Sequence, residues 1–280
     1  MSSIDLPKTK RNLIVAVMLV SAFVAILNQT LLNTALPHIM RELKIDESTS
    51  QWLITGFMLV NGVMIPLTAF LMDRVKTRPL YLGAMGTFLL GSIVAAVAPN
   101  FGVLMTARVI QAIGAGVLMP LMQFTLFTLF SKEHRGFAMG LAGLVIQFAP
   151  AIGPTFTGLI IDNASWRVPF IIIVGIALIA FIFGLISISS YNETKDSKLD
   201  KRSVVYSTIG FGIMLYAFRT AGYFGFSNPL VIGSIIISII IFSIFVRRQL
   251  TISNPLLNLN VFKGRIFCFS TITSMIIMLY

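Results

Sequence analysis

The sequence has little of what a water-soluble or disulfide-stabilised protein needs. Cys268 is its only cysteine, which excludes an intrachain disulfide and a thiolate metal cluster. Charged residues make up 11% of the 280 residues and hydrophobic residues 56%, whereas an average soluble domain is about 25% charged. A soluble fold of this size has no means of hiding so much apolar surface. We therefore expect the lipid bilayer to be the solvent of this chain.

Acidic residues are also scarce, with 10 Asp and Glu against 21 Lys and Arg, for a net charge of +11. In a soluble protein such a balance suggests nucleic-acid binding. Here the sequence offers no solvated basic domain to carry that function, so we expect no nucleic-acid partner. Basic residues in short loops instead set the orientation of membrane helices.

Long apolar runs dominate the chain, and a membrane-spanning helix needs roughly 20 mainly apolar residues. The seventh span is expected to end at Phe218, with Arg219 reaching out from its far end. A ninth run starts at Ile266 and is expected to be truncated at Tyr280. The eight complete candidates are Leu13–Pro37, Gln51–Met72, Pro79–Ala98, Val103–Phe130, Phe137–Ile161, Val168–Ser189, Ser203–Phe218 and Pro229–Val246.

The distribution of basic residues among the loops predicts a cytoplasmic N-terminus in the cell membrane. With that orientation, the outer segments hold only Arg41, Lys44, Arg167 and Arg219. The inner segments hold Lys8, Lys10, Arg11, Arg74, Lys76, Arg78, Lys132, Arg135, Lys195, Lys198, Lys201, Arg202, Arg247, Arg248, Lys263 and Arg265.

These spans and loops predict five regions. They are a six-helix half at 1–189, a cytoplasmic linker at 190–202, a two-helix insertion at 203–247, a second cytoplasmic linker at 248–265, and a truncated helix at 266–280. A weak internal repeat relates Asn28–Pro37 in the first span to Gln111–Pro120 in the fourth. Two related groups of three helices in opposite orientation are found in each half of many transporters.

Five motifs, in order along the chain, resemble those of fourteen-helix drug:proton antiporters of the major facilitator superfamily. Leu27–Pro37 is similar to the first-helix signature, Asp73–Arg78 to the loop between helices two and three, and Arg108–Gly116 to the fourth-helix motif. Gly153–Gly158 resembles the fifth-helix antiporter motif, and Pro255–Phe262 the segment that follows the extra helix pair.

The resemblance implies an all-α polytopic membrane protein: one six-helix half, two linker helices and a truncated ninth helix. It further implies export of small amphipathic compounds in exchange for protons by alternating access, with no enzymatic activity and no cofactor. A missing C-terminal half or a second chain would then be needed as a partner. The alternatives are a transport-incompetent truncated product and a facilitator or lipid exporter, because a fold does not fix its substrate.

Arg108 is the only charged residue well inside a complete span, about two turns into the fourth helix. A charge at that depth costs at least about 2.5–3.5 kcal/mol, so we expect it to face a water-filled cleft and to find a partner. Gln111 lies one turn away on the same face. For Arg108, a role in proton coupling or substrate binding competes with a purely structural role. The other candidates for the substrate cavity are Asn28, Gln29, Asn33 and Gln147.

The family usually has Asp where Asn28 stands, which leaves proton handling by the first helix in doubt. Two further groups take their expected roles from the resemblance. A cytoplasmic latch between the two halves is expected at Asp73, Arg74 and Arg78, and a seal against leak is expected at the helix-five antiporter motif Gly153, Pro154 and Gly158. The competing interpretation of the loop charges is that they only follow the positive-inside rule. The competing interpretation of the helix-five motif is that glycine and proline are frequent in membrane helices. Gly143, Gly153 and Gly158 are expected to allow close helix contact.

Overall fold

The computed structural model describes residues 7–161, 164–192, 194, 200–252, 255–257 and 259–279. These residues form helices joined by short connections, and the described ranges contain no strand. The chain divides into two compact units, Met1–Asp196 and Ser197–Tyr280, and each is described here by itself. Their boundary falls within the expected linker at 190–202. The all-α fold class that the resemblance implies is confirmed.

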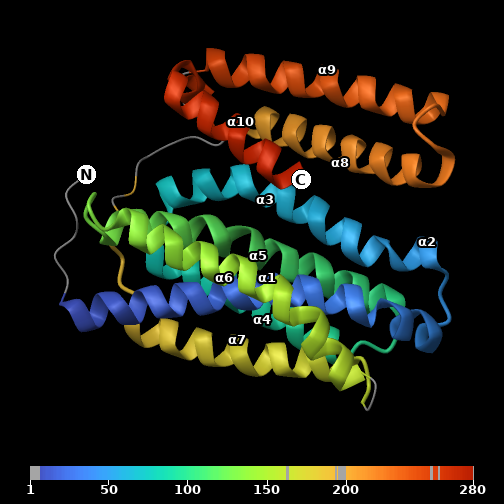
Figure 1. Ribbon diagram of the computed structural model, residues 1–280, viewed down its shortest axis with the longest axis horizontal. Helices are drawn as coiled ribbons and strands as arrows, with labels where there is room; N and C mark the ends of the chain where they lie inside the picture. The colour runs from blue at the N-terminus through green and yellow to red at the C-terminus, as the bar shows by residue number, and fades with distance from the viewer. Residues whose placement is uncertain are drawn as a thin grey trace. The chain divides into compact units, whose positions relative to one another are not determined.

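The first unit contains six helices or helix pairs that are long and apolar enough to cross a membrane (Figure 1). A short helix, α2, directly precedes α3, and the two together make one of the six. The elements are α1 Lys8–Leu43, α2 Glu47–Ser50, α3 Trp52–Arg74, α4 Thr77–Ala96, α5 Phe101–Leu129, α6 Arg135–Ile161 and α7 Arg167–Ser187. With two more in the second unit, they match the eight complete spans that the sequence predicts.

Local chemistry fixes several of the helix ends. Asn100 caps α5, since its side-chain oxygen accepts a hydrogen bond from the Val103 N–H at 3.0 Å. Lys44 ends α1 in the left-handed conformation, with φ of 53°, and its N–H bonds back to the Met40 carbonyl. These caps satisfy backbone groups that the helices themselves leave unpaired.

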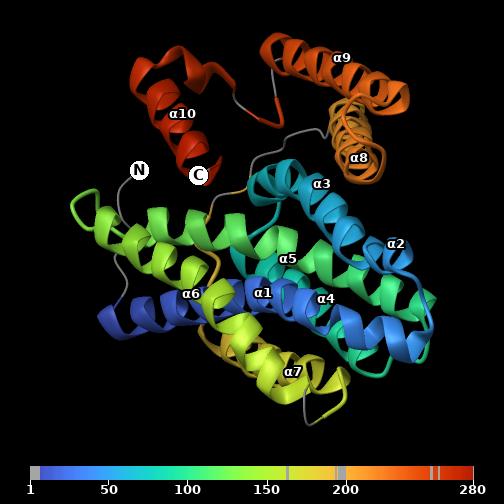
Figure 2. The same ribbon diagram turned by 45° about the vertical axis from the view of Figure 1, so that its right-hand side comes forward.

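Helices α1 and α5 are the most buried spans of the first unit. Helix α5 packs against α3 and α4, while α1 packs against α6 and α7, and the two also contact each other. Figures 1 and 2 show this arrangement, with α7 beside α4 and α1. The polar residues of α1 and α5 that face each other are therefore enclosed by the surrounding helices.

The second unit consists of α8 Lys201–Phe224, α9 Pro229–Thr251, a 3-10 helix η1 Leu259–Lys263 and α10 Arg265–Leu279. Helices α8 and α9 pack together as a hairpin, and Asn228 caps α9 by accepting from the Leu230 N–H at 2.9 Å. The predicted end of the seventh span at Phe218 is wrong. Helix α8 continues past Arg219 because an apolar and aromatic run follows it, and it stops at Gly225, where φ is 77°.

The two helices of the hairpin also include residues that the sequence predicts to lie in the two linkers. Helix α8 already begins at Lys201, and α9 continues through Thr251. Arg248, in the last turn of α9, pairs with Asp200, which directly precedes α8, as described below. Helix α10 covers most of the expected ninth span.

Candidate functional site

The Arg108 side chain lies wholly inside the first unit, with an exposed fraction of 0%. Its Nε donates to the Leu53 carbonyl of α3 at 3.3 Å, and its guanidinium carbon lies 4.2 Å from the centre of the Phe57 ring. The expectation that Arg108 faces an open cleft is therefore wrong for this unit. The side chain instead lies between α5 and α3, where a backbone carbonyl and an aromatic face stabilise the cation.

Gln111 connects Arg108 to two further helices. Its side-chain oxygen accepts from Arg108 Nη1 at 2.9 Å, as the spacing of three residues on one helix predicts. Its Nε2 donates to Asn28 Oδ1 on α1 at 3.3 Å and to Ser92 Oγ on α4 at 3.0 Å. We call these four residues the Arg108 network. It joins α1, α4 and α5, and it connects through the Leu53 carbonyl to α3.

Close packing of α4 on α5 brings Ser92 within reach of Gln111. A Cβ on Gly91 would lie 2.6 Å from the Gln111 backbone nitrogen, so only glycine permits this approach. Ser92 was not predicted as a site residue, because serine is common in membrane helices and nothing local marks this one. The available signal was the Gly91–Ser92 pair, which is a small residue beside a polar one on the helix facing α5.

The Arg108 network has a positive charge and neutral partners. Its members are all fully buried. Among the described residues, neither Arg108 Nη2 nor Asn28 Nδ2 has a hydrogen-bond partner. Unsatisfied buried donors are unfavourable, and a buried cation without a counter-charge more so. Each of these two buried donors therefore lacks the oxygen acceptor that would satisfy it.

The structure does not bring the other cavity candidates into the network. Gln29 is half-buried on α1, and Gln147 is exposed on α6. Asn33 is exposed further along α1, where it lines a pocket of about 550 Å³ together with Pro37 and Arg41. Asn28 and Gln111 do meet, and they are the first residues of the two segments that the internal repeat relates.

The expected latch residues lie around the connection between α3 and α4, and all three side chains are exposed. Asp73 and Arg74 end α3, and Arg78 lies in the first turn of α4. Arg78 Nη2 donates to the Leu185 carbonyl near the end of α7 at 3.0 Å. A cation at a helix C-terminus is favourable because carbonyls there lack helical partners. Arg78 thus links α4 to α7 within the first unit.

The helix-five antiporter motif lies on α6, next to α1. A Cβ on Gly153 would come within 2.3 Å of Thr30 Oγ1, so the close contact expected at this residue is present. At Gly143 and Gly158, by contrast, a Cβ would meet no described atom within 4 Å, so the expectation of close contact is wrong for these two. Pro154 lies inside the helix, which continues through it to Ile161.

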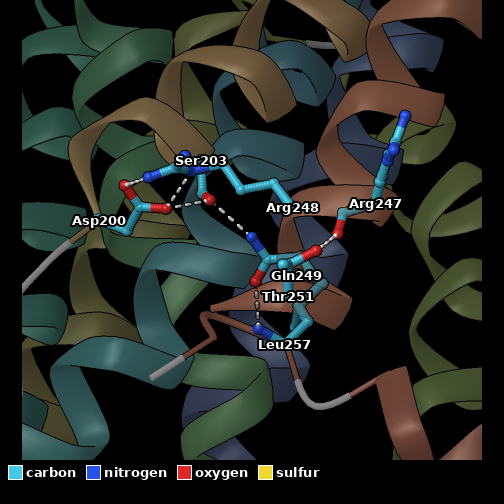
Figure 3. Close-up of polar contacts among 7 residues, drawn as sticks. All are labelled: Asp200, Ser203, Arg247, Arg248, Gln249, Thr251 and Leu257. Atoms are coloured by element: carbon cyan, nitrogen blue, oxygen red, sulfur yellow. Dashed lines mark hydrogen bonds and ion pairs between the residues drawn. The ribbon is translucent and has the colours of Figure 1, made fainter. Parts of the chain in front are cut away.

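A second polar cluster, which sequence reasoning missed, holds the α8–α9 hairpin together (Figure 3). Arg248 donates to both carboxylate oxygens of Asp200, from Nε at 2.6 Å and from Nη2 at 2.9 Å. Ser203 donates to Asp200 Oδ2 at 2.5 Å and accepts from Gln249 Nε2 at 2.6 Å. Gln249 Oε1 in turn accepts from the Leu257 N–H at 3.1 Å, which holds the chain that follows α9.

The hydrogen bonds from Arg248 are the main cause that lowers the pKa of Asp200 to about 2. Asp200 and Arg248 lie near the start of α8 and the end of α9. The sequence signal was an acidic residue just before one predicted span and a basic pair just after the next. That signal could have predicted a pair that closes the hairpin.

Comparison with known proteins identifies the family. The Major Facilitator Superfamily model matches residues 18–280. The chain is 46% identical over 271 residues to the uncharacterized MFS-type transporter YcnB of Bacillus subtilis (strain 168), covering 97% of this chain and 57% of that protein. It is 40% identical over 264 residues to the lincomycin resistance protein LmrB of the same strain, covering 94% of this chain and 55% of that protein. The chain thus spans about half the length of the curated relatives it matches.

Solved structures show the same fold at low sequence identity. The human organic anion transporter MFSD10 (TETRAN) aligns with a TM-score of 0.60 at 16% identity, over 77% of this chain and 57% of that chain. A peptide transporter POT (E310Q mutant) in complex with alafosfalin aligns with a TM-score of 0.64 at 13% identity, over 85% and 52%. Family model, relatives and fold agree, and this chain is a multi-pass membrane protein that belongs to the Major Facilitator Superfamily of transporters.

Proposed function

We propose that this chain supplies one half of a proton-coupled exporter of small amphipathic compounds, and that the Arg108 network is its coupling site. The observation that carries the proposal is a fully buried arginine whose described partners are all neutral. A charge inside a membrane helix bundle is energetically unfavourable, and charged residues kept there usually mark a substrate, ion or proton pathway. The relatives named for lincomycin resistance, multidrug resistance or multidrug export support drug-like compounds as the substrate class.

The network is suited to respond to a change of charge nearby. Arg108 keeps its positive charge, and the buried Nη2, which has no hydrogen-bond partner among the described residues, binds a carboxylate of the substrate or of a second half once a movement of the helices exposes it. When such a carboxylate is ionised, it pairs with Arg108; when it is protonated, the pair weakens. Gln111 would pass this change to α1 and α4, because it bonds to both. In this proposal Arg108 modulates the proton carrier and does not itself release a proton.

Alternating access requires two halves that move about a central site. We therefore propose that the first unit works with a second six-helix half, on the same polypeptide or on another. The N-terminus of the first unit lies in the cytoplasm in this proposal. The excess of basic residues in the loops on the same side of the membrane as the N-terminus supports this orientation. In this proposal the connection between α3 and α4 lies on the cytoplasmic side, where the exposed Asp73, Arg74 and Arg78 act as a latch.

The test is export from cells or vesicles that contain the full-length transporter. Arg108→Lys keeps the charge but loses the planar set of donors, and Arg108→Gln loses the charge. We expect both to reduce proton-driven export at least tenfold at matched expression, with substrate binding retained in Arg108→Lys. Wild-type export by Arg108→Gln would refute the coupling role, and loss of folded protein in both variants would support a structural role.

A second candidate is a facilitator that moves its substrate without protons. It is favoured by Asn28, whose amide does not titrate, and by the lack of Asp and Glu from the middle of the spans that the structure describes. Collapsing the proton gradient separates the two functions. Export against a concentration gradient that stops on collapse supports antiport, whereas unchanged downhill flux supports the facilitator.

A further inference from the structure

The connection between α3 and α4 is held by a side chain that lies far away in the sequence. Asn192, which follows α7, donates from Nδ2 to the carbonyls of Met72 at 2.9 Å and Val75 at 3.0 Å. Its Oδ1 accepts from both the N–H and the hydroxyl of Thr77, each at 2.7 Å. One amide thus uses both of its donor hydrogens and both of its acceptor positions.

These bonds satisfy backbone groups that two helices leave unpaired. The last carbonyls of α3 and the first N–H groups of α4 have no partners within their own helices. Thr77 is completely buried, so water has no access to this side chain. Asn192 therefore satisfies both sides of this connection, because its amide donates to the carbonyls of Met72 and Val75 and accepts from the N–H and hydroxyl of Thr77.

The segment around Asn192 is fixed at further points. The hydroxyl groups of Tyr191 and Thr125 on α5 lie 2.6 Å apart and share a hydrogen bond, and burial raises the pKa of the Tyr191 phenol. Arg78 bonds to the Leu185 carbonyl of α7. Asn192 and Tyr191 thus hold the segment after α7 against the α3–α4 connection and α5, while Arg78 holds the last turn of α7. A displacement of this segment would act directly on the connection between α3 and α4.

We propose that Asn192 is the positioning residue of the α3–α4 connection. It sets the angle at which α3 ends and α4 begins, and so it places Asp73, Arg74 and Arg78. It also makes that connection sensitive to the segment that leaves the first unit. This role follows from the hydrogen bonds alone and does not depend on transport or on its direction.

Asn192→Asp is the sharpest test, because it keeps the shape and the acceptors but loses both donors. Basic residues surround this connection, at Arg74, Lys76 and Arg78, and their charge would favour a carboxylate. A loosened connection in Asn192→Asp therefore comes from the lost donors, together with the repulsion between the new carboxylate oxygen and the carbonyls of Met72 and Val75. Thr194→Asp is the matched control, since it adds the same charge to an exposed position two residues further on.

The measurement is amide hydrogen exchange of the purified chain in detergent micelles. We expect exchange at residues 73–80 to become about tenfold faster in Asn192→Asp, with the α5 and α1 amides unchanged and Thr194→Asp like wild type. Wild-type exchange at 73–80 in Asn192→Asp would overturn the proposal, and so would an equal acceleration throughout the unit. If Asn192→Asp does not fold, Thr77→Val removes one of the four bonds, and the same local acceleration, smaller in size, decides the question.

Discussion

At the scale of single residues, polar side chains satisfy one another inside an apolar bundle, and Gln111 has the most partners in the Arg108 network. Its Oε1 accepts from Arg108, and its Nε2 donates to both Asn28 and Ser92. A buried hydrogen bond contributes little net stability, but an unpaired buried group costs much more. Loss of the Gln111 side chain would therefore leave several buried polar groups unpaired, and we expect the stability of this region to depend strongly on it.

We expect Gln111→Leu to lower the free energy of unfolding by about 1–3 kcal/mol, because it leaves Arg108 Nη1 unpaired. Gln111→Glu should stay near wild type, since its carboxylate pairs with Arg108 and the Asn28 amide can turn its free Nδ2 toward it. Thermal unfolding in detergent is the measurement, and Gln123→Leu on the exposed side of α5 is the control. Equal loss in Gln111→Leu and Gln111→Glu would contradict this account of the network.

At the scale of helices, one close approach fixes α6 on α1. A Cβ on Gly153 would overlap Thr30, whose hydroxyl bonds to the Leu27 carbonyl at 2.9 Å and so has little freedom to move. Gly158 belongs to the same motif but faces open space. The two glycines therefore have different structural roles, although the motif alone does not distinguish them.

Gly153→Ala is expected to destabilise the chain by about 1–3 kcal/mol, because the added methyl group forces α1 and α6 apart. Gly158→Ala should be neutral or stabilising by up to about 1 kcal/mol, since alanine favours helix where there is room. Both variants are compared with wild type by thermal unfolding in detergent. A larger loss in Gly158→Ala than in Gly153→Ala would show that the α1–α6 contact is not where the structure has it.

The α8–α9 hairpin depends on one ion pair, and its neighbour in the sequence is the matched control. Arg248 bonds to Asp200 through two hydrogen bonds, whereas the exposed Arg247 points away from it (Figure 3). We expect Arg248→Gln to lower the free energy of unfolding at neutral pH by a small but measurable amount, and Arg247→Gln to have no effect. Equal effects of the two substitutions would exclude a specific pair.

The same pair predicts a pH dependence. The pKa of Asp200 is about 2 in the folded chain, below the value of about 3.9 in an unfolded one. Folding therefore favours the ionised carboxylate, and its contribution is complete above about pH 4 and is lost as the pH falls from about 4 to about 2. The difference in stability between wild type and Arg248→Gln should shrink over this range. A constant difference down to pH 2 would assign the effect to packing of the Arg248 stem.

At the scale of the whole molecule, the orientation in the membrane can be tested with two positions at opposite ends of α3. Ser48 and Lys76 are both exposed, and the 23 residues of α3 between them span about 34 Å. Thr77 is unsuitable for labelling because its side chain is buried. Cys268 is the only cysteine, so its replacement by serine gives a background free of cysteine.

In that background, an impermeant thiol reagent applied to intact cells should label Ser48→Cys and not Lys76→Cys. Permeabilised cells should show labelling of both, which controls for reactivity. The expected result follows from the excess of basic residues in the loops on the side of Lys76. Labelling of Lys76→Cys from outside would reverse the orientation, and with it the side on which the α3–α4 connection lies.

The sequence by itself determined the membrane class, the eight spans and the family, and the spacing of Arg108 and Gln111 predicted their contact. These features are local: a helix in lipid satisfies its backbone within its own segment, so composition and length are enough to place it. Only the tertiary structure decided which helix faces meet. It paired Asn28 with Gln111, brought Ser92 and Asn192 to their partners, and separated the role of Gly153 from that of Gly158. Such contacts depend on the rotation and depth of each helix against its neighbours, which packing sets and no single segment encodes.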